Sequence, residues 1–543
     1  MKRAAFTLPV FITVLYWRSI YGAFVLDDRT FFIENDVLPH IKPWNVKAIF
    51  SGATNYWGDL LPVRDVLYVL EYNLFGLNTI GYHLVSIALY ILVCSSAYLF
   101  LRRFYSDEDS INATSGRARP ALVALIVALI FAAYPVHVEA VAYITGQKDL
   151  LFSLFAFVAM LVFYVFFNSS KRGKKFAIIG IALYYLALLS KPTAVMLSIV
   201  IPLIYLLSDR AKRPKPLNAL VLWVVAQIPA LLWIITYIHL GRPLYKSIPA
   251  ILHVPLGERL IAALRILGAH TVLAFKPFPL SFGYPFRLSA SVDLNFVAGL
   301  VVLAAAILLL LRFRNDRVVV FAICLYMFSL FPVLQLQGPL GNESIYDRYL
   351  FIPVLSVAML FERGLRSLAL THNRPTAYLT AVFVVVIVFS AITFSYIPAF
   401  RNDIAVTRNT YQKFPEGPGS GFNYVYSLIE SGRLDEAYQI TLKEKTLSSP
   451  PWVRDYFIGW ILLERGLTEQ AIPELNAAAY IAMSGGYFPF PNLPLARAYI
   501  RAGRDSEAIW LLQEALKSPI YQPLEEYRAR EILKQIGSGK DHT

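Results

Sequence analysis

The feature that most limits how this chain can fold is a series of apolar runs, each close to a lipid bilayer in length. Because a helix needs about 20 mostly apolar residues to cross the hydrocarbon core, these runs predict about eleven membrane spans and an all-α, polytopic helical bundle. Only 16% of the residues are charged, against about 25% in soluble proteins, which also indicates an integral membrane protein. The eleven runs are 4–24, 81–101, 120–134, 150–167, 176–189, 194–207, 217–240, 296–311, 318–334, 349–361 and 377–396.

The basic residues indicate how the predicted spans are oriented. Within residues 1–400 most of them lie in short clusters that flank the apolar runs, at 2–3, 102–119, 171–175, 210–215, 312–317 and 363–374. Cytoplasmic loops are enriched in lysine and arginine. All six clusters fall on one side if the charged helical stretch 256–274 lies along the membrane surface instead of crossing it. This orientation predicts a cytoplasmic N-terminus and places the large loop 25–80 outside, together with 135–149, 241–295, 335–348 and the C-terminal part.

Several classes of protein are disfavoured. The formal charge of +14 is explained by membrane orientation, and no basic-aromatic module for nucleic acid is visible. Cys94 and Cys324 lie inside apolar runs, so neither a disulfide framework nor a cysteine zinc site is expected. No phosphate-binding loop, dinucleotide fingerprint or Gly-x-Ser-x-Gly elbow occurs. The first run could be a signal peptide, but its length favours a retained span.

A repeated pattern follows the last apolar run. The sequence GRLDEA at 432–437 recurs as GLTEQA at 466–471 and as GRDSEA at 503–508. Ala437 and Ala471 are separated by 34 residues, the period of tetratricopeptide repeats, and residues 484–492 are the predicted insertion before the third repeat. The pattern predicts two domains: a membrane domain at 1–400 and about three helix-turn-helix repeats at 401–543. The repeats are either a solvent-facing cap or a surface for a polypeptide partner.

Two adjacent carboxylates, Asp27 and Asp28, directly follow the first apolar run. They could cap the next helix. They could instead supply a general base, which accepts the proton of an attacking hydroxyl group. A carboxylate at this depth would meet both a lipid-borne donor and a soluble acceptor.

His137 and Glu139 lie in the next outer loop. In an extended loop these two side chains would share a face, whereas in a helix they would not. With Asp27 or Asp28 as a third ligand they could hold a metal ion. They could also be a hydrogen-bonded scaffold that orients the aspartates, or have a purely structural role, and the sequence leaves all three open.

Four cations lie at the predicted outer face: Arg64, Lys148, Lys191 and Arg348. Such residues often anchor helix ends by extending their charged groups to the interface. The alternative is phosphate binding, because arginine contacts phosphate with two N–H groups and lysine supplies a point charge. Converging cations would stabilise an anionic leaving group such as a polyprenyl phosphate.

In order along the chain, these motifs resemble the transmembrane and tetratricopeptide repeat-containing proteins. The resemblance is carried by FVLDD at 24–28, ENDV at 34–37, YWG at 56–58, PVR at 62–64, FGLN at 75–78, YHL at 82–84, YPVHVEAVA at 134–142, GQKDL at 146–150, PLSFGY at 279–284 and DRYL at 347–350. The chain departs from the family pattern in its short repeat array, in Asp65 after Arg64, and in Tyr134 where the family has histidine.

The resemblance implies a GT-C-type fold and sugar transfer, with mannose as the expected sugar, from a polyprenyl-phosphate monosaccharide to serine or threonine hydroxyls of proteins. It implies that Asp27 and Asp28 are catalytic, with Asp27 preferred as the base. His137 and Glu139 would support them, and Arg348 would contact phosphate. It implies no particular cofactor and leaves a divalent metal open.

The short repeat array favours a bacterial inner-membrane protein with a periplasmic site over one of the endoplasmic reticulum with a lumenal site. The expected partners are the lipid-linked donor, membrane lipids and an acceptor polypeptide held by the repeats. The acceptor could instead be a lipid or glycan, the donor could carry an oligosaccharide, or the chain could be a non-enzymatic membrane scaffold.

Overall fold

The computed structural model describes residues 2–35, 37–51, 54, 60–111, 120–169, 173–240, 254–286, 289, 291–336, 345–372, 374–417, 419–443, 452–484, 492–517 and 523–537. Asp36, the Tyr-Trp-Gly motif at 56–58 and most of the predicted insertion at 484–492 lie outside these ranges. Within them the secondary structure is helical, without a β-strand. The chain divides into two compact units, Met1–Phe282 with Phe286–Asn402, and Gly283–Pro285 with Asp403–Thr543.

In the described part of the first unit, five helices are long and apolar enough to cross a membrane. A sixth candidate is a bent pair of helical segments. The first is α5 (Pro120–Ala133), and the second consists of η4 (Pro135–His137) and α6 (Val138–Ala142). The angle between the two segments is 58°. The bend follows from Pro135, because a residue before proline is driven out of the helical region, and Tyr134 is extended with ψ 126°. These helices make the chain an integral membrane protein. The five are α4 (Thr79–Ile111), α7 (Gln147–Phe167), α10 (Pro216–Leu240), α13 (Leu294–Arg312) and α16 (Pro375–Tyr396).

The five other predicted spans are helical but shorter or interrupted, so the total of eleven stays a prediction. They correspond to α1 (Lys2–Tyr16) with η1 (Trp17–Tyr21), α8 (Lys174–Ser190), η6 (Pro192–Met196) with α9 (Leu197–Leu207), α14 (Arg317–Leu330) with η8 (Phe331–Val333), and η9 (Asp347–Leu350) with α15 (Pro353–Thr371).

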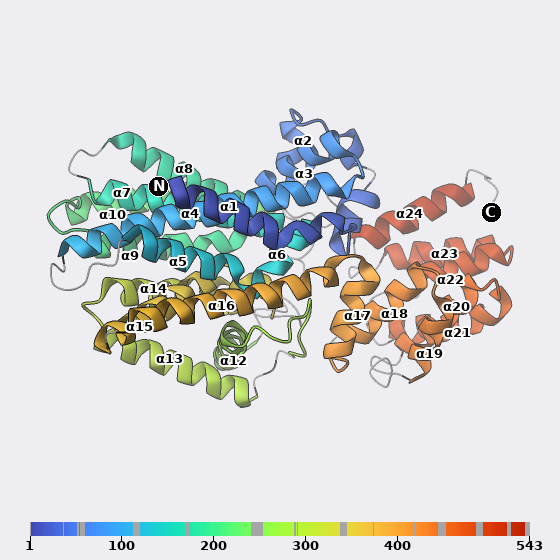
Figure 1. Cartoon of the computed structure of the whole chain (residues 1–543). Coiled ribbons are helices and arrows are strands. Elements are labelled where there is room, and N and C mark those ends of the chain that lie inside the picture. The colour runs from blue at the N-terminus through green and yellow to red at the C-terminus, as the bar shows by residue number, and fades with distance from the viewer. Residues whose placement is uncertain are drawn as a thin grey trace. The chain divides into compact units, whose positions relative to one another are not determined.

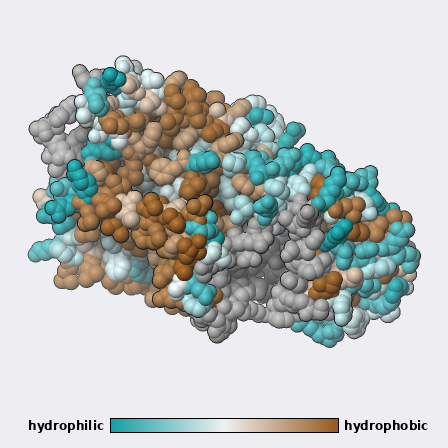
Figure 2. Space-filling view, turned by 90° about the horizontal axis from the view of Figure 1, so that it is seen from below, coloured by the Kyte–Doolittle hydropathy of each residue, from teal (hydrophilic) through white to brown (hydrophobic). Residues whose placement is uncertain are grey.

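The interior of the first unit is built around α4, α5 and α7. These helices run side by side, with α16 against α5 (Figure 1). In contrast, the most apolar stretches of α13 and α16 are only 6% and 11% buried. Figure 2 shows the broad hydrophobic surface that results. Apolar side chains on the outside of a bundle are expected where the solvent is lipid.

Two glycines bring α12 (Leu256–Phe275) against α13. A Cβ atom on Gly268 would lie 2.0 Å from the Asn295 carbonyl oxygen, and one on Gly299 would lie 2.0 Å from that of Leu264. Small residues permit such close contact between membrane helices. Figure 1 shows α12 nearly along its axis while α4, α5 and α16 run across the view. This crosswise direction is what a surface helix would have, and the surface assignment remains a proposal.

The second unit contains three helical hairpins that share one type of turn. In each turn a glycine adopts positive φ: 73° at Gly432, 78° at Gly466 and 70° at Gly503. The residue after each glycine donates its N–H to a carbonyl five residues earlier, as from Leu467 to Leu462 at 3.0 Å, which is the Schellman helix ending. The hairpins are α18 (Ser420–Glu430) with α19 (Leu434–Lys443), α20 (Trp452–Glu464) with α21 (Thr468–Ser484), and α22 (Asn492–Arg501) with α23 (Asp505–Leu516).

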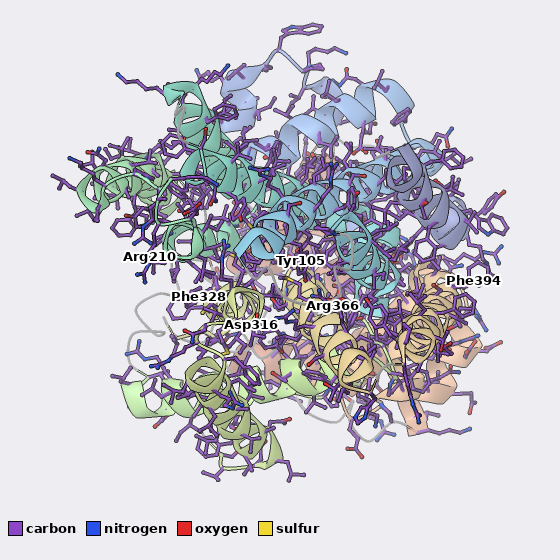
Figure 3. All side chains as sticks on the ribbon, turned by 60° about the vertical axis from the view of Figure 1, so that its left-hand side comes forward. Tyr105, Arg210, Asp316, Phe328, Arg366 and Phe394 are labelled. Carbon is purple, nitrogen blue, oxygen red and sulfur yellow. The ribbon has the colours of Figure 1, made fainter. Side chains whose placement is uncertain are left out.

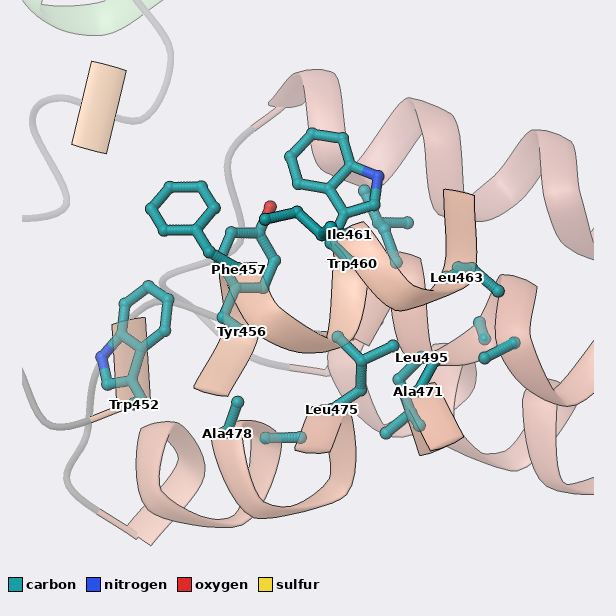
Figure 4. Close-up of a cluster of buried hydrophobic side chains, with 14 of the residues drawn as sticks. Trp452, Tyr456, Phe457, Trp460, Ile461, Leu463, Ala471, Leu475, Ala478 and Leu495 are labelled. Atoms are coloured by element: carbon teal, nitrogen blue, oxygen red, sulfur yellow. The ribbon is translucent and has the colours of Figure 1, made fainter. Parts of the chain in front are cut away.

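Small residues let the hairpin helices approach one another around an aromatic core. Ala471 and Ala478 are fully buried beside Leu475 (Figure 4). A Cβ atom on Gly459 would lie 2.6 Å from the Leu475 Cγ atom. Among its described residues this unit also has α17 (Asp403–Lys413) and α24 (Pro523–Gly537). The helix-turn-helix pattern agrees with the predicted repeats, and their assignment to the tetratricopeptide class stays a prediction.

Candidate functional site

The two aspartates of the loop at 25–80 differ sharply in their surroundings. The chain leaves η1 in extended form, turns at Leu26 with φ +50°, and enters a helical turn that leads into η2 (Arg29–Ile33). A positive φ is uncommon for leucine. Directly after this turn Asp27 is exposed and Asp28 is fully buried. The adjacent carboxylates therefore cannot have the same role.

Thr145 holds the buried carboxylate. The Oδ1 atom of Asp28 accepts a hydrogen bond from the Thr145 N–H at 2.6 Å and another from the Thr145 hydroxyl at 2.5 Å. Its Oδ2 atom accepts from the N–H of Val25 at 3.2 Å. Burial raises the pKa of Asp28 to about 7, against the opposing effect of these hydrogen bonds. Asp28 thus joins the loop at 25–80 to the segment before α7.

The same segment makes a second contact with the first loop. Gln147 donates from Nε2 to Glu71 at 2.8 Å, and to Ser86 and the Tyr82 carbonyl at 3.1 Å each. Glu71 lies on α3 (Pro62–Phe75) and is buried, which raises its pKa to about 8. Gln147 and Thr145 therefore fix the loop at two points.

Asp27 is exposed close to Tyr143. Burial and the neighbouring charge of Asp27 raise the pKa of Tyr143. Tyr143 is itself packed edge-to-face against Phe282, at 5.7 Å between ring centroids. Asp27 is therefore an accessible carboxylate beside a rigid aromatic wall, which suits a proton acceptor.

Ion pairs hold several of the predicted phosphate-binding cations. Arg348 pairs with Glu139, which also accepts the Arg348 backbone N–H at 3.0 Å. Lys191 pairs with Asp149, and its ammonium lies 5.2 Å from the centre of the Tyr349 ring. Paired cations can still bind phosphate, because a guanidinium has five N–H donors and an ammonium three.

Arg64 is fully buried and lies 2.8 Å from the Asp65 carboxylate. The acidic residue at which this chain departs from the family pattern thus supplies the partner of the arginine. Lys148 is half-buried at the start of α7. The four cations are therefore not equivalent, and Arg64 has the least contact with solvent.

His137 and Glu139 do not share a face, because both lie in helical turns. Nδ1 of His137 lies 2.7 Å from the Tyr90 hydroxyl, and Nε2 lies 3.2 Å from the Phe351 carbonyl oxygen. Among the described residues no hydrogen bond joins His137 or Glu139 to Asp27 or Asp28, and no three metal-ligating side chains come together. Thr145 provides the contact with Asp28 and is not among the residues that the sequence predicted for the site. It lies directly before the Gly-Gln-Lys-Asp motif at 146–149, which marks this segment in the sequence.

Comparison with known proteins identifies similar proteins that are named protein O-mannosyl-transferases. Human TMTC1, named a protein O-mannosyl-transferase, is 23% identical over 502 residues, which cover 79% of this chain and 53% of TMTC1. The resemblance to the transmembrane and tetratricopeptide repeat-containing (TMTC) proteins is thereby confirmed. Human TMTC3, of the same named type, is 28% identical over 160 residues, or 28% of this chain and 16% of TMTC3. Tmtc3 of Drosophila melanogaster is 30% identical over 166 residues, or 27% of this chain and 17% of that protein.

The match to TMTC1 thus spans about half of that protein, and the matches to the TMTC3 proteins span less than a fifth of each. No family model matches the chain, and no solved structure matches it. The likeness to TMTC1 is the broadest of the three, since it covers 79% of this chain.

Proposed function

We propose that this chain is an inverting glycosyltransferase that moves mannose from a polyprenyl-phosphate carrier to serine or threonine hydroxyls of proteins. The observation that carries the proposal is the different environment of Asp27 and Asp28. Asp27 is exposed directly after the turn at Leu26. Asp28 is buried and accepts three hydrogen bonds, which hold this turn in place. The names of the TMTC relatives support the class of reaction.

In this reaction the acceptor hydroxyl oxygen attacks the anomeric carbon from the side opposite the lipid phosphate. Asp27 takes the hydroxyl proton as the new C–O bond forms. The bond between the anomeric carbon and the phosphate oxygen breaks, and the phosphate leaves with the bonding electrons. Asp28 touches neither reactant and acts as a positioning residue. A single displacement needs one base, unlike the paired carboxylates of a glycosidase.

The leaving phosphate would be stabilised by the cations Lys148, Lys191 and Arg348. Glu139 and Asp149 fix the positions of two of these cations, so little reorganisation is required when charge develops. The helical hairpins of the second unit would hold the acceptor polypeptide, since stacked helix pairs form extended binding surfaces. The proposed location is a bacterial inner membrane with the site facing the periplasm.

The test is transfer of labelled mannose from polyprenyl-phosphate mannose to candidate polypeptides by the purified protein. We expect Asp27→Asn to lower the rate by about 10²-fold or more, the usual contribution of a general base. Glu258→Gln is the matched control, because Glu258 is an exposed carboxylate on α12 of the membrane unit that has no assigned role in the reaction. Each variant is checked for monodisperse elution.

A folded Asp27→Asn variant with full activity would contradict the assignment of the base. Intact-mass analysis of the polypeptides separates transfer to protein from transfer to a lipid or glycan. A wild-type protein that is inert with several donor sugars would overturn the proposed reaction and favour a scaffold.

A further inference from the structure

A cavity of about 250 Å³ lies in the membrane unit between the end of η1 and η10 (Ile397–Phe400). Two arginines, Arg18 and Arg401, are among the ten residues that line it, and none of the ten is acidic. The N–H of Ala23 donates to the Arg401 carbonyl at 2.9 Å, which fixes the two chain segments together. The cavity therefore combines two positive charges with a wall held in place by the backbone.

The two arginines are available to a ligand. Neither forms an ion pair with a carboxylate of the residues that the structure describes, and both are exposed. The guanidinium of Arg18 lies over the Phe394 ring, 4.9 Å from its centre. Phe394 projects from α16 at the edge of the bundle (Figure 3). In contrast, Arg64, Lys191 and Arg348 are each paired with a carboxylate.

The position of the cavity indicates the level of the lipid headgroups. The cavity lies at the end of the candidate span Pro375–Phe400. Only 11% of the most apolar stretch of this span is buried. Trp17 and Tyr21, which also line it, are 46% and 67% exposed. Tryptophan and tyrosine are enriched where membrane helices meet water. A ligand here would have its charged group at the interface and its chains beside α16.

We propose that this cavity binds the phosphate group of a membrane lipid through Arg18 and Arg401. Arginine is suited to this ligand because its planar guanidinium makes two parallel hydrogen bonds with phosphate. The proposal does not require the transfer reaction. Lys148, Lys191 and Arg348, the cations assigned to the donor phosphate, do not line the cavity, so this is a second site for lipid phosphate. The lipid could be a diacyl phospholipid or a polyprenyl phosphate, which share this chemistry.

The test measures lipid retained by the purified full-length protein in detergent, by native mass spectrometry. Phosphatidylglycerol and polyprenyl monophosphate are added separately, and diacylglycerol serves as the lipid without phosphate. We expect Arg18→Gln/Arg401→Gln to lower retention of at least one phosphate-bearing lipid by about tenfold, the loss expected for charge-assisted hydrogen bonds. The lipid that is lost identifies the source of the phosphate.

The matched control is Arg312→Gln, because Arg312 is also exposed and also lies over an aromatic ring, at 5.3 Å from that of Phe313. An equal loss in this control, or equal loss of diacylglycerol, would overturn the proposal, and so would unchanged retention in the double variant. Arg18→Lys should lose less than Arg18→Gln because it keeps the charge. Binding is measured without sugar transfer, so failure of the proposed reaction would not alter this outcome.

Discussion

Thr145 donates both its backbone N–H and its hydroxyl to the same carboxylate oxygen of Asp28, at 2.6 and 2.5 Å. The two residues are 117 positions apart in the chain. Thr145 belongs to the segment between α6 and α7, and Asp28 to the loop at 25–80. This contact fixes the backbone of Asp27, the exposed carboxylate that we propose as the base.

Removing the Thr145 hydroxyl should weaken this link. Thr145→Val keeps the size of the side chain but deprives a buried carboxylate of one donor, which costs about 1–3 kcal/mol. We expect a lower unfolding midpoint and a transfer rate reduced by about tenfold, because Asp27 is less well positioned. The control is Thr407→Val, which removes a buried hydroxyl in the second unit. Equal loss of transfer in both variants would contradict a positioning role for Thr145.

Stability should depend on pH through two buried carboxyl groups. Burial raises the pKa of Asp28 from 3.8 to about 7 and that of Glu71 from 4.5 to about 8. Between the unfolded and folded pKa values the native state holds protons that the unfolded chain has lost. The free energy of unfolding therefore falls as pH rises from about 4 to about 8.

The decrease in stability with rising pH is followed by measuring the thermal unfolding midpoint in detergent at a series of pH values. Asp28→Asn should flatten the part of the profile below about pH 7, and Glu71→Gln the part that extends to about pH 8. The double variant should be the flattest. Profiles that all run parallel to wild type would show that these two groups do not control the pH dependence.

Gly146 should not tolerate a side chain. Its added Cβ atom would lie 2.8 Å from the Ala140 Cα atom and from the carbonyl oxygens of Glu139 and Ala140. Backbone atoms cannot move away as a flexible side chain can, so Gly146→Ala should displace Thr145 and cost about 1–3 kcal/mol. Gly364→Ala is the control, because nothing lies within 4 Å of its Cβ position. A Gly146→Ala protein as stable and active as the control would contradict this tight fit.

Gly466 should be required for its backbone angle instead of for space. Its φ is +78° and its Cβ position is open. Left-handed backbone costs other residues about 1–2 kcal/mol, so Gly466→Ala should lower the midpoint of the second unit, as followed by limited proteolysis of the full chain. Gly466→Asn should lower it less, because asparagine adopts this conformation more readily. If asparagine and alanine are equally damaging, the backbone explanation is wrong.

The sequence by itself determined the helical class, the membrane setting, the Gly-containing repeat turns and the resemblance to the TMTC proteins. These follow from local patterns: apolar runs that suit a bilayer, glycines at fixed spacing, and short motifs in a fixed order. It also brought Asp27 and Asp28 to attention, because adjacent carboxylates at the end of a span are conspicuous. The number of spans was less determined, since several runs are shorter than the hydrocarbon core.

Only the tertiary structure decided which aspartate is exposed, and that Thr145 holds the other. The same is true of the pairing of Arg348 with Glu139, and of the cavity beside Arg18 and Arg401. Each of these depends on contacts between residues far apart in the chain. Burial and hydrogen bonding depend on the side chains that other helices pack against a residue. The identity of a carboxylate or arginine therefore does not reveal whether it is held in an ion pair or accessible to a ligand.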